Sequence, residues 1–166
     1  DAADAYALLG QVREMSVQLG DGTDVTVQDI RIRRQITGES LLVAEPDTGA
    51  TGVSGQDHGT TEESTDQKDL VCQKFIIYGN LKLPESRKVT EAQGREICRE
   101  TEALLQQRLQ QLADEAKENG QGDMTGSYGF LAGLDRKLWE EYADRPELYE
   151  KYLYTTIDVR LKQLRI

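Results

Sequence analysis

The most regular pattern of apolar and polar positions runs from residue 84 to about residue 119. Apolar side chains recur there every three or four positions, which places them on one stripe of an α-helix: Val89, Ala92, Ile97, Leu104, Leu105, Leu109, Leu112, Ala113 and Ala116. Pro84 suits a first helical turn, and Asn119-Gly120 suits a helix end. The stripe fits a core helix packed on a sheet, and it also fits an arm used for oligomerisation. It is not a clean heptad, and Gly94 costs a helix about 1 kcal/mol.

The first third of the chain alternates in a different way. Residues 1–13 have a short helical pattern, and apolar residues then alternate with polar ones on both sides of Asp21-Gly22. That dipeptide readily adopts positive φ, so the pattern predicts a β-hairpin. The alternation slips between Val27 and Ile30, and a β-bulge near Gln28-Asp29 would restore the inward face. Arg31, Arg33 and Arg34 follow on this strand, and we interpret them as a solvated strand face.

The middle of the chain contains a long polar segment between two strand-like runs. Residues 41–43 predict a short strand, and residues 45–69 carry too few large apolar residues to order themselves, which predicts a surface loop. Residues 71–78 form the most apolar strand-like run. Gly79-Asn80 then allows either a tight turn with a short return strand or one continuous strand into the helix.

The last forty residues or so show helical spacing in two pieces separated by Pro146. The first piece places Tyr128, Leu131, Leu134 and Leu138 on one face, and it should end before the proline. The second would begin with Asp144 as its N-cap and run towards the C-terminus. Residues 155–159 are rich in β-branched side chains, so a terminal strand is the alternative.

Together these patterns predict an α+β fold. A small antiparallel β-rich N-terminal part, residues 1–83 with the polar loop 45–69, precedes a helical region, residues 84–166. In that region the long amphipathic helix is followed by two further C-terminal helices. We expect the second region to serve as an arm or oligomerisation region.

Charge and composition limit the classes of partner. The chain contains 20 Lys and Arg and 30 Asp and Glu, which gives a net charge of −10. This charge argues against nucleic acid as the partner, because phosphate binding needs a basic face. No apolar run reaches the roughly 18 residues that suggest a membrane span. A membrane contact would therefore require a segment outside this chain. A basic protein surface remains compatible with this charge.

No pattern of residues predicts catalysis, a metal site or a cofactor. The single histidine, His58, lies in the polar loop without acidic or cysteine partners at metal-ligand spacing. Cys72 and Cys98 are expected to be buried, reduced thiols, with a disulfide between them left open because the sequence does not give their separation. We therefore expect no catalytic, cofactor-binding or metal-ligating residues, and no enzymatic activity.

The aromatic and leucine-rich positions of the second half are candidates for a subunit interface. Tyrosine combines apolar area with a polar tip, which suits contacts between proteins, although the same rings also suit a thin core. The interface candidates are Leu104, Leu109, Leu112, Phe130, Trp139, Tyr142, Tyr149, Leu153 and Tyr154.

Two stretches resemble a known superfamily. Residues 90–96, Thr-Glu-Ala-Gln-Gly-Arg-Glu, are similar to the Ala/Glu/Gly-rich helical arm of the prohibitin–stomatin (SPFH) proteins. Phe130-Leu131-Ala132, followed by Glu-Tyr-Ala-Asp-Arg-Pro-Glu-Leu-Tyr at residues 141–149, resembles the end of that arm in HflK-type protease modulators. The resemblance covers roughly residues 84–160. The arm is shorter here, and residues 1–83 do not match the family's head domain.

This resemblance implies a non-enzymatic scaffold that assembles with other copies of itself or with related subunits. In that family, such assemblies lie at a membrane and restrain a membrane protease. Two alternatives follow from the residues alone: a structural subunit of a large particle such as a virion or secretion machine, and a small protein-binding module that uses the loop 45–69.

Overall fold

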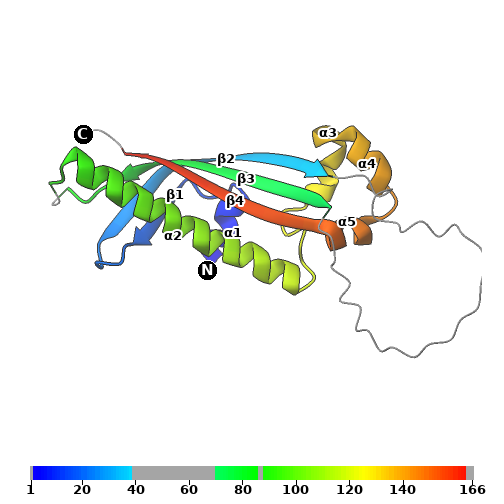
Figure 1. Ribbon diagram of the computed structural model, residues 1–166, viewed down its shortest axis with the longest axis horizontal. Coiled ribbons are helices and arrows are strands. Elements are labelled where there is room, and N and C mark those ends of the chain that lie inside the picture. Colours follow the sequence, from blue (N-terminus) through cyan, green and yellow to red (C-terminus); the bar gives the residue numbers. More distant parts are fainter. Residues whose placement is uncertain (1, 39–69, 86–87, 164–166) are drawn as a thin grey trace, which may run out of the picture.

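The computed structural model describes residues 2–38, 70–85 and 88–163, and these form one four-stranded sheet with helices on one face and at one end (Figure 1). The strands lie in the order β1-β2-β3-β4. β1 pairs with β2 and β2 with β3 in antiparallel fashion, whereas β3 and β4 run parallel. The predicted α+β fold is confirmed. The short strand predicted at residues 41–43, the loop 45–69 and His58 lie outside the described residues.

The N-terminal hairpin forms where the alternation predicts it. Helix α1 (Ala2–Leu8) precedes β1 (Glu14–Gln18) and β2 (Asp24–Gly38). Gly22 adopts a φ of 81° in the turn, and the register of β2 against β3 shifts between Gln28 and Arg31. Asp29 has a φ of 54° at that shift, which confirms the predicted bulge.

Residues 71–82 form one continuous strand, β3 (Val71–Lys82), rather than a hairpin. Gly79 lies opposite Leu161 of β4, within the paired part of both strands. A Cβ at this position would approach Val27 Cγ1 to 2.6 Å. The glycine therefore serves close packing within the sheet, not a turn.

The long helix is shorter at its start than the sequence predicts. α2 (Glu91–Glu118) begins after Thr90, whose hydroxyl accepts a hydrogen bond from the Gln93 N–H while the Gln93 side chain accepts one from the Thr90 N–H. Such a reciprocal cap typically stabilises a helix by about 1 kcal/mol, and it overrides Pro84 as the start. The predicted end is confirmed, since Asn119 is the C-cap and Gly120 has a φ of 71°.

The C-terminal region divides into short helices and a final strand. The predicted second helix is split into η2 (Ser127–Phe130), α3 (Leu131–Leu134) and α4 (Arg136–Tyr142). α5 (Pro146–Tyr152) starts with its proline in the first turn, and Asp144 does not cap it, because Arg145 occupies the N-cap position. β4 (Leu153–Gln163) then replaces the predicted helix, so the alternative of a terminal strand is correct.

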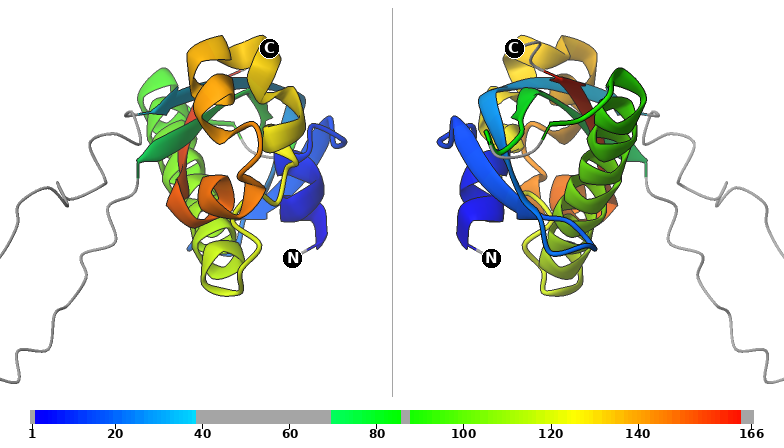
Figure 2. Two further views of the ribbon diagram at one scale, coloured as in Figure 1. Left: turned by 90° about the vertical axis from the view of Figure 1, so that its right-hand side faces the viewer. Right: turned by 90° about the vertical axis from the view of Figure 1, so that its left-hand side faces the viewer.

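One face of the sheet is covered by α1 and α2 (Figure 2). The stripe of α2 buries Ile97, Leu105 and Leu109 against strand residues such as Phe75 and Ile157. Asp4 of α1 is 4% exposed, and its carboxylate lies 2.7 Å from Arg108 Nη2 of α2. A second apolar cluster lies under α3, α4 and α5 at the end of the sheet.

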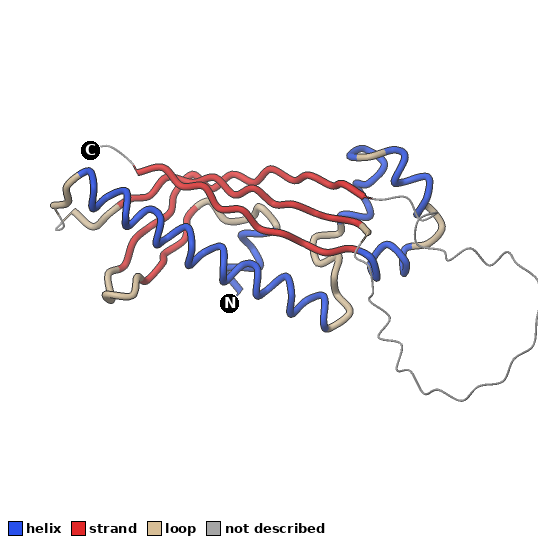
Figure 3. The backbone as a smooth tube through the Cα atoms, viewed as in Figure 1, coloured by secondary structure: helices blue, strands red, loops and turns tan. Residues whose placement is uncertain are grey.

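The outer edge of β4 is covered by side chains of α2, which runs alongside it (Figure 3). Glu102 Oε1 accepts a hydrogen bond from the Leu161 N–H at 2.6 Å, and Gln106 Oε1 accepts one from the Val159 N–H at 3.4 Å. Gln110 Oε1 accepts one from the Ile157 N–H at 3.0 Å. Four helical residues rise about 6 Å and two strand residues about 6.6 Å, so the two repeats match. The helix thus takes the place of a neighbouring strand.

Candidate protein-binding surface

The predicted interface residues are divided between core and surface. Tyr142, Tyr149 and Leu153 are 0% exposed and Leu109 is 1% exposed within the chain's own core. A partner cannot reach these four side chains, because they already fill the space beneath the sheet and the C-terminal helices. Leu104, Leu112, Trp139 and Tyr154 are half-buried, and Phe130 is 57% exposed.

The aromatic group near the C-terminal helices is an internal structural unit. The rings of Tyr128 and Tyr149 have centroids 5.4 Å apart, and those of Tyr142 and Tyr149 lie 5.7 Å apart. The Tyr149 hydroxyl shares a 2.8 Å hydrogen bond with Ser127 Oγ. Burial raises the pKa of Tyr149 to about 12. The clustered tyrosines therefore stabilise one end of this fold, which was the alternative to an interface.

The face of the sheet opposite α1 and α2 carries no helix along most of its length (Figures 1 and 2). Its side chains come from the polar positions of three strands, and the register places them in rows. We call this surface the basic face and define it by these rows: Arg31, Tyr78 and Arg160; Arg33, Ile76 and Asp158; Gln35, Lys74 and Thr156; Gln28, Asn80 and Lys162.

The basic face has a charge opposite to that of the whole chain. Its rows contain five Arg and Lys and one Asp, although the chain has a net charge of −10. Asp158 is paired with Arg160 at 2.7 Å and with Lys74 at 3.7 Å. Its hydrogen bond raises the pKa of the Arg160 guanidinium. Arg31 and Arg33 are exposed, and neither forms an ion pair with any residue that the structure describes.

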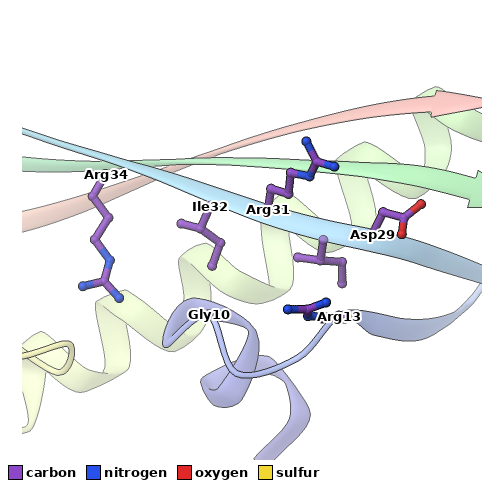
Figure 4. Close-up of a pocket in the computed structure, with 7 residues that line it drawn as sticks. Gly10, Arg13, Asp29, Arg31, Ile32 and Arg34 are labelled. Atoms are coloured by element: carbon purple, nitrogen blue, oxygen red, sulfur yellow. The ribbon is translucent and has the colours of Figure 1, made fainter.

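Two hollows lie beside the bulge in β2. The first, of about 350 Å³, is on the basic face between Arg31, Tyr78 and Arg160. The second, of about 660 Å³, lies along the outer edge of β2 and is lined by Gly10, Arg13, Ile30, Ile32 and Arg34 among others. Figure 4 shows Ile32 and Arg34 pointing towards the turn that carries Gly10 and Arg13, while Arg31 points to the opposite side.

The two cysteines lie on opposite faces of the sheet and are not bonded to each other. Cys72 is half-buried on the side of the basic face, with Sγ 3.9 Å from Thr156 Oγ1. Cys98 is buried in α2, and burial raises the pKa of its thiol, with a smaller contribution from Glu102. Both cysteines are free thiols, as expected, but the expected burial holds for Cys98 and not for Cys72.

Neither a metal cluster nor a membrane-spanning helix is found in the described part of the chain. No three His, Cys, Asp or Glu side chains among residues 2–38, 70–85 and 88–163 gather in a way that could hold a metal ion. None of the described helices is both long and apolar enough to cross a bilayer.

Sequence reasoning found part of the basic face and missed the rest. It assigned Arg31 and Arg33 to a solvated strand face, and the structure places both there. It placed Arg34 with them, but this guanidinium lies on the other face, 5.5 Å from the Phe75 ring centroid. Arg160 and Lys162 were missed because their segment was read as helical. The alternation of Ile157, Val159 and Leu161 is the signal that identifies them.

Comparison with known proteins identifies a fold but no family. No model of a protein family matches the chain, and no curated protein matches it. Among solved structures, the crystal structure of the GerBC protein is similar, with a TM-score of 0.67 and 10% sequence identity. The match covers 99% of this chain and 46% of the GerBC chain, so the chain spans about half the length of that protein. At this identity the likeness shows the fold alone.

Proposed function

We propose that this chain is a non-enzymatic protein-binding domain of a multi-subunit assembly, and that a partner subunit with an acidic surface docks on the basic face. The observation that carries the proposal is a sheet with one face packed on helices and the other face bearing arginines that form no ion pair with any described residue. An uncovered face of a mixed sheet with polar and aromatic side chains offers area and hydrogen-bonding groups to a protein.

The arrangement of charges favours a protein over a nucleic acid. Asp158 lies among the basic residues and is bonded to two of them, so the surface alternates in sign instead of forming a continuous positive track. The net charge of −10 would also repel a polyanion at a distance. A partner with a few acidic groups placed opposite Arg31 and Arg33 needs no continuous positive track, and complementary charges would orient it.

The likeness to the GerBC protein concerns the fold, because nearly the whole of this chain superposes on about half of that chain at 10% identity. We propose that the chain assembles with other copies of itself or with related subunits. The resemblance to prohibitin–stomatin arms stays a prediction, and it implies an assembly of the same kind. A membrane contact would be made by a segment outside this chain.

Site-specific photo-crosslinking in the natural host tests the proposal. A photoreactive amino acid is placed at Arg33 or Lys74 on the basic face, and at Gln107 or Gln111 on the exposed side of α2 as matched controls. We expect the basic-face positions to capture a defined protein through an acidic segment, identified by mass spectrometry. Equal capture from the α2 positions, or capture of nucleic acid or lipid instead, would contradict the proposal.

A further inference from the structure

We propose that the outer edge of β2 from Arg31 to Ile36 binds an extended acidic segment of a protein partner, which adds to the sheet as a further strand. This inference rests on the proposed protein-binding function and specifies the mode of recognition. It concerns the strand edge and the groove beside it, whereas the preceding proposal concerns the face of the sheet.

The two outer edges of this sheet differ in how their backbone groups are satisfied. On β4, three successive outward N–H groups donate to Glu102, Gln106 and Gln110 of α2. On β2, the pairing with β1 covers Asp24 to Gln28 and no more. One further hydrogen bond on this side of β2 runs from the Ile30 N–H to the Arg13 carbonyl, at 3.2 Å.

Beyond Ile30 no described strand lies outside β2. Its pairing with β3 continues from Arg31 to Gly38, so alternate residues of this stretch direct their N–H and C=O groups outward. Such a row of unpaired groups is a template for strand addition, in which main-chain hydrogen bonds give affinity. Arg31 to Ile36 spans roughly 20 Å, enough for about five or six residues of an extended partner.

The groove beside this edge defines the chemistry of the segment. Its volume is about 660 Å³, and Ile32 gives it an apolar floor that is only half-buried. Its lining includes the arginines Arg13, Arg31 and Arg34 and one acidic residue, Asp29 (Figure 4). The Arg34 guanidinium lies 5.5 Å from the centroid of the Phe75 ring. A carboxylate on the inner side of an added strand would meet these guanidinium groups, and one on the other side would meet Arg31 or Arg33.

The same charges argue against a second copy of this chain as the occupant. Antiparallel pairing of two β2 edges would bring Arg31, Arg33 and Arg34 of both copies close together. Like charges directly opposite each other on neighbouring strands are destabilising, and charged side chains on an edge are a common defence against self-association. A segment rich in Glu or Asp converts this repulsion into attraction, so the edge selects an acidic partner.

The test uses a short blocked peptide that alternates Glu and Val, with two control peptides. One control alternates Lys and Val, and the other is the acidic peptide N-methylated at alternate positions, which cannot donate hydrogen bonds to the edge. Binding is followed by NMR on the isotopically labelled chain. We expect the acidic peptide alone to shift the amide signals of residues 31–36 and to slow their hydrogen exchange.

Charge reversal then locates the site. Arg34→Glu and Arg13→Glu should each weaken acidic-peptide binding by about tenfold, whereas Arg99→Glu, a charge reversal at an exposed position of α2 outside both the groove and the basic face, should change it by less than about twofold. Arg13 lies in a turn, so its variant tests the groove even if Arg34→Glu disturbs the contact with Phe75. Equal binding of the N-methylated peptide, equal loss in Arg99→Glu, or shifts confined to the basic face would overturn the inference.

Each of the two proposals can be refuted without refuting the other. Crosslinking of a partner at Arg33 or Lys74 without peptide-induced protection of residues 31–36 would refute strand addition and leave docking on the basic face. Protection by the acidic peptide without any crosslinked protein in the host would refute that docking and leave the edge as an acidic-strand site.

Discussion

Truncation of Gln110 to alanine should destabilise the fold much more than truncation of Gln111. Gln110 makes two hydrogen bonds to the edge of β4: its Nε2 donates to the Thr155 carbonyl at 2.8 Å, and its Oε1 accepts from the Ile157 N–H at 3.0 Å. Gln111 is exposed, and its one side-chain hydrogen bond to a described residue goes to Glu115 on the same helix, at 2.8 Å. The two variants therefore have the same composition and differ in the contact with β4.

The magnitude follows from the groups left without partners. A net hydrogen bond contributes about 0.5–1.5 kcal/mol, and a buried group that loses its partner costs about 1–3 kcal/mol. Ile157 is 5% exposed, whereas Gln110 and Thr155 are half-buried and admit some water. We expect Gln110→Ala to cost about 2 kcal/mol, or about 4–8 °C in Tm. Gln111→Ala should stay within about 0.5 kcal/mol of the wild type.

Urea and thermal unfolding monitored by circular dichroism measure both variants, provided that the transitions are two-state. Glu102→Gln supplies a further control, because it keeps an acceptor for the Leu161 N–H whereas Glu102→Ala removes it. We expect the glutamine variant to retain most of the stability that the alanine variant loses. Equal unfolding free energies for the Gln110 and Gln111 variants would refute the idea that α2 substitutes for a neighbouring strand.

Three further predictions follow from the packing of the core. Gly94→Ala should stabilise α2 by up to about 1 kcal/mol, and by more in a Gln163→Ala background, because in the wild type the new Cβ would meet the end of the Gln163 side chain, which must move aside. Unfolding of the four proteins in this cycle checks it. Burial raises the pKa of Tyr149 to about 12, against about 10 in the unfolded chain. The stabilisation that the neutral Tyr149 hydroxyl gives to the folded state is therefore complete below about pH 10 and is lost as the pH rises towards 12. The fall in unfolding free energy over this window should be shallower in Tyr149→Phe. Cys72, half-buried, should react with a thiol reagent faster than Cys98, which is buried and whose pKa is raised; rates from Cys72→Ser and Cys98→Ser proteins decide this.

The spacing of apolar residues predicted the long helix and its end but not what its stripe faces. Leu105 and Leu109 have the same spacing whether they pack on the chain's own sheet or on another chain. The structure gives them 2% and 1% exposure against strand residues of the same chain. Pairing between β3 and β4, which are about eighty residues apart, creates that partner surface, and no local pattern reveals such a long-range contact.

The mistaken helix at the C-terminus has a simple geometric cause. Leu153, Ile157 and Leu161 are four residues apart, and this spacing keeps side chains on one side of both a helix and a strand. Val159 distinguishes a strand from a helix, because its side chain faces the core together with Ile157 and Leu161 only in a strand. Without β4, sequence reasoning could not place Arg160 opposite Arg31 across Tyr78, and the basic face remained unrecognised.

The affinity of the partner protein for charge-reversed variants of this chain tests docking on the basic face most directly. The protein crosslinked at Arg33 is purified, and its affinity is measured for the wild-type chain, for a double Arg31→Glu/Arg33→Glu variant and for Arg99→Glu, an exposed arginine on α2. We predict that the double variant binds at least about tenfold more weakly, with an unchanged Tm, while Arg99→Glu binds like the wild type. Unchanged affinity of the double variant would contradict docking on this face.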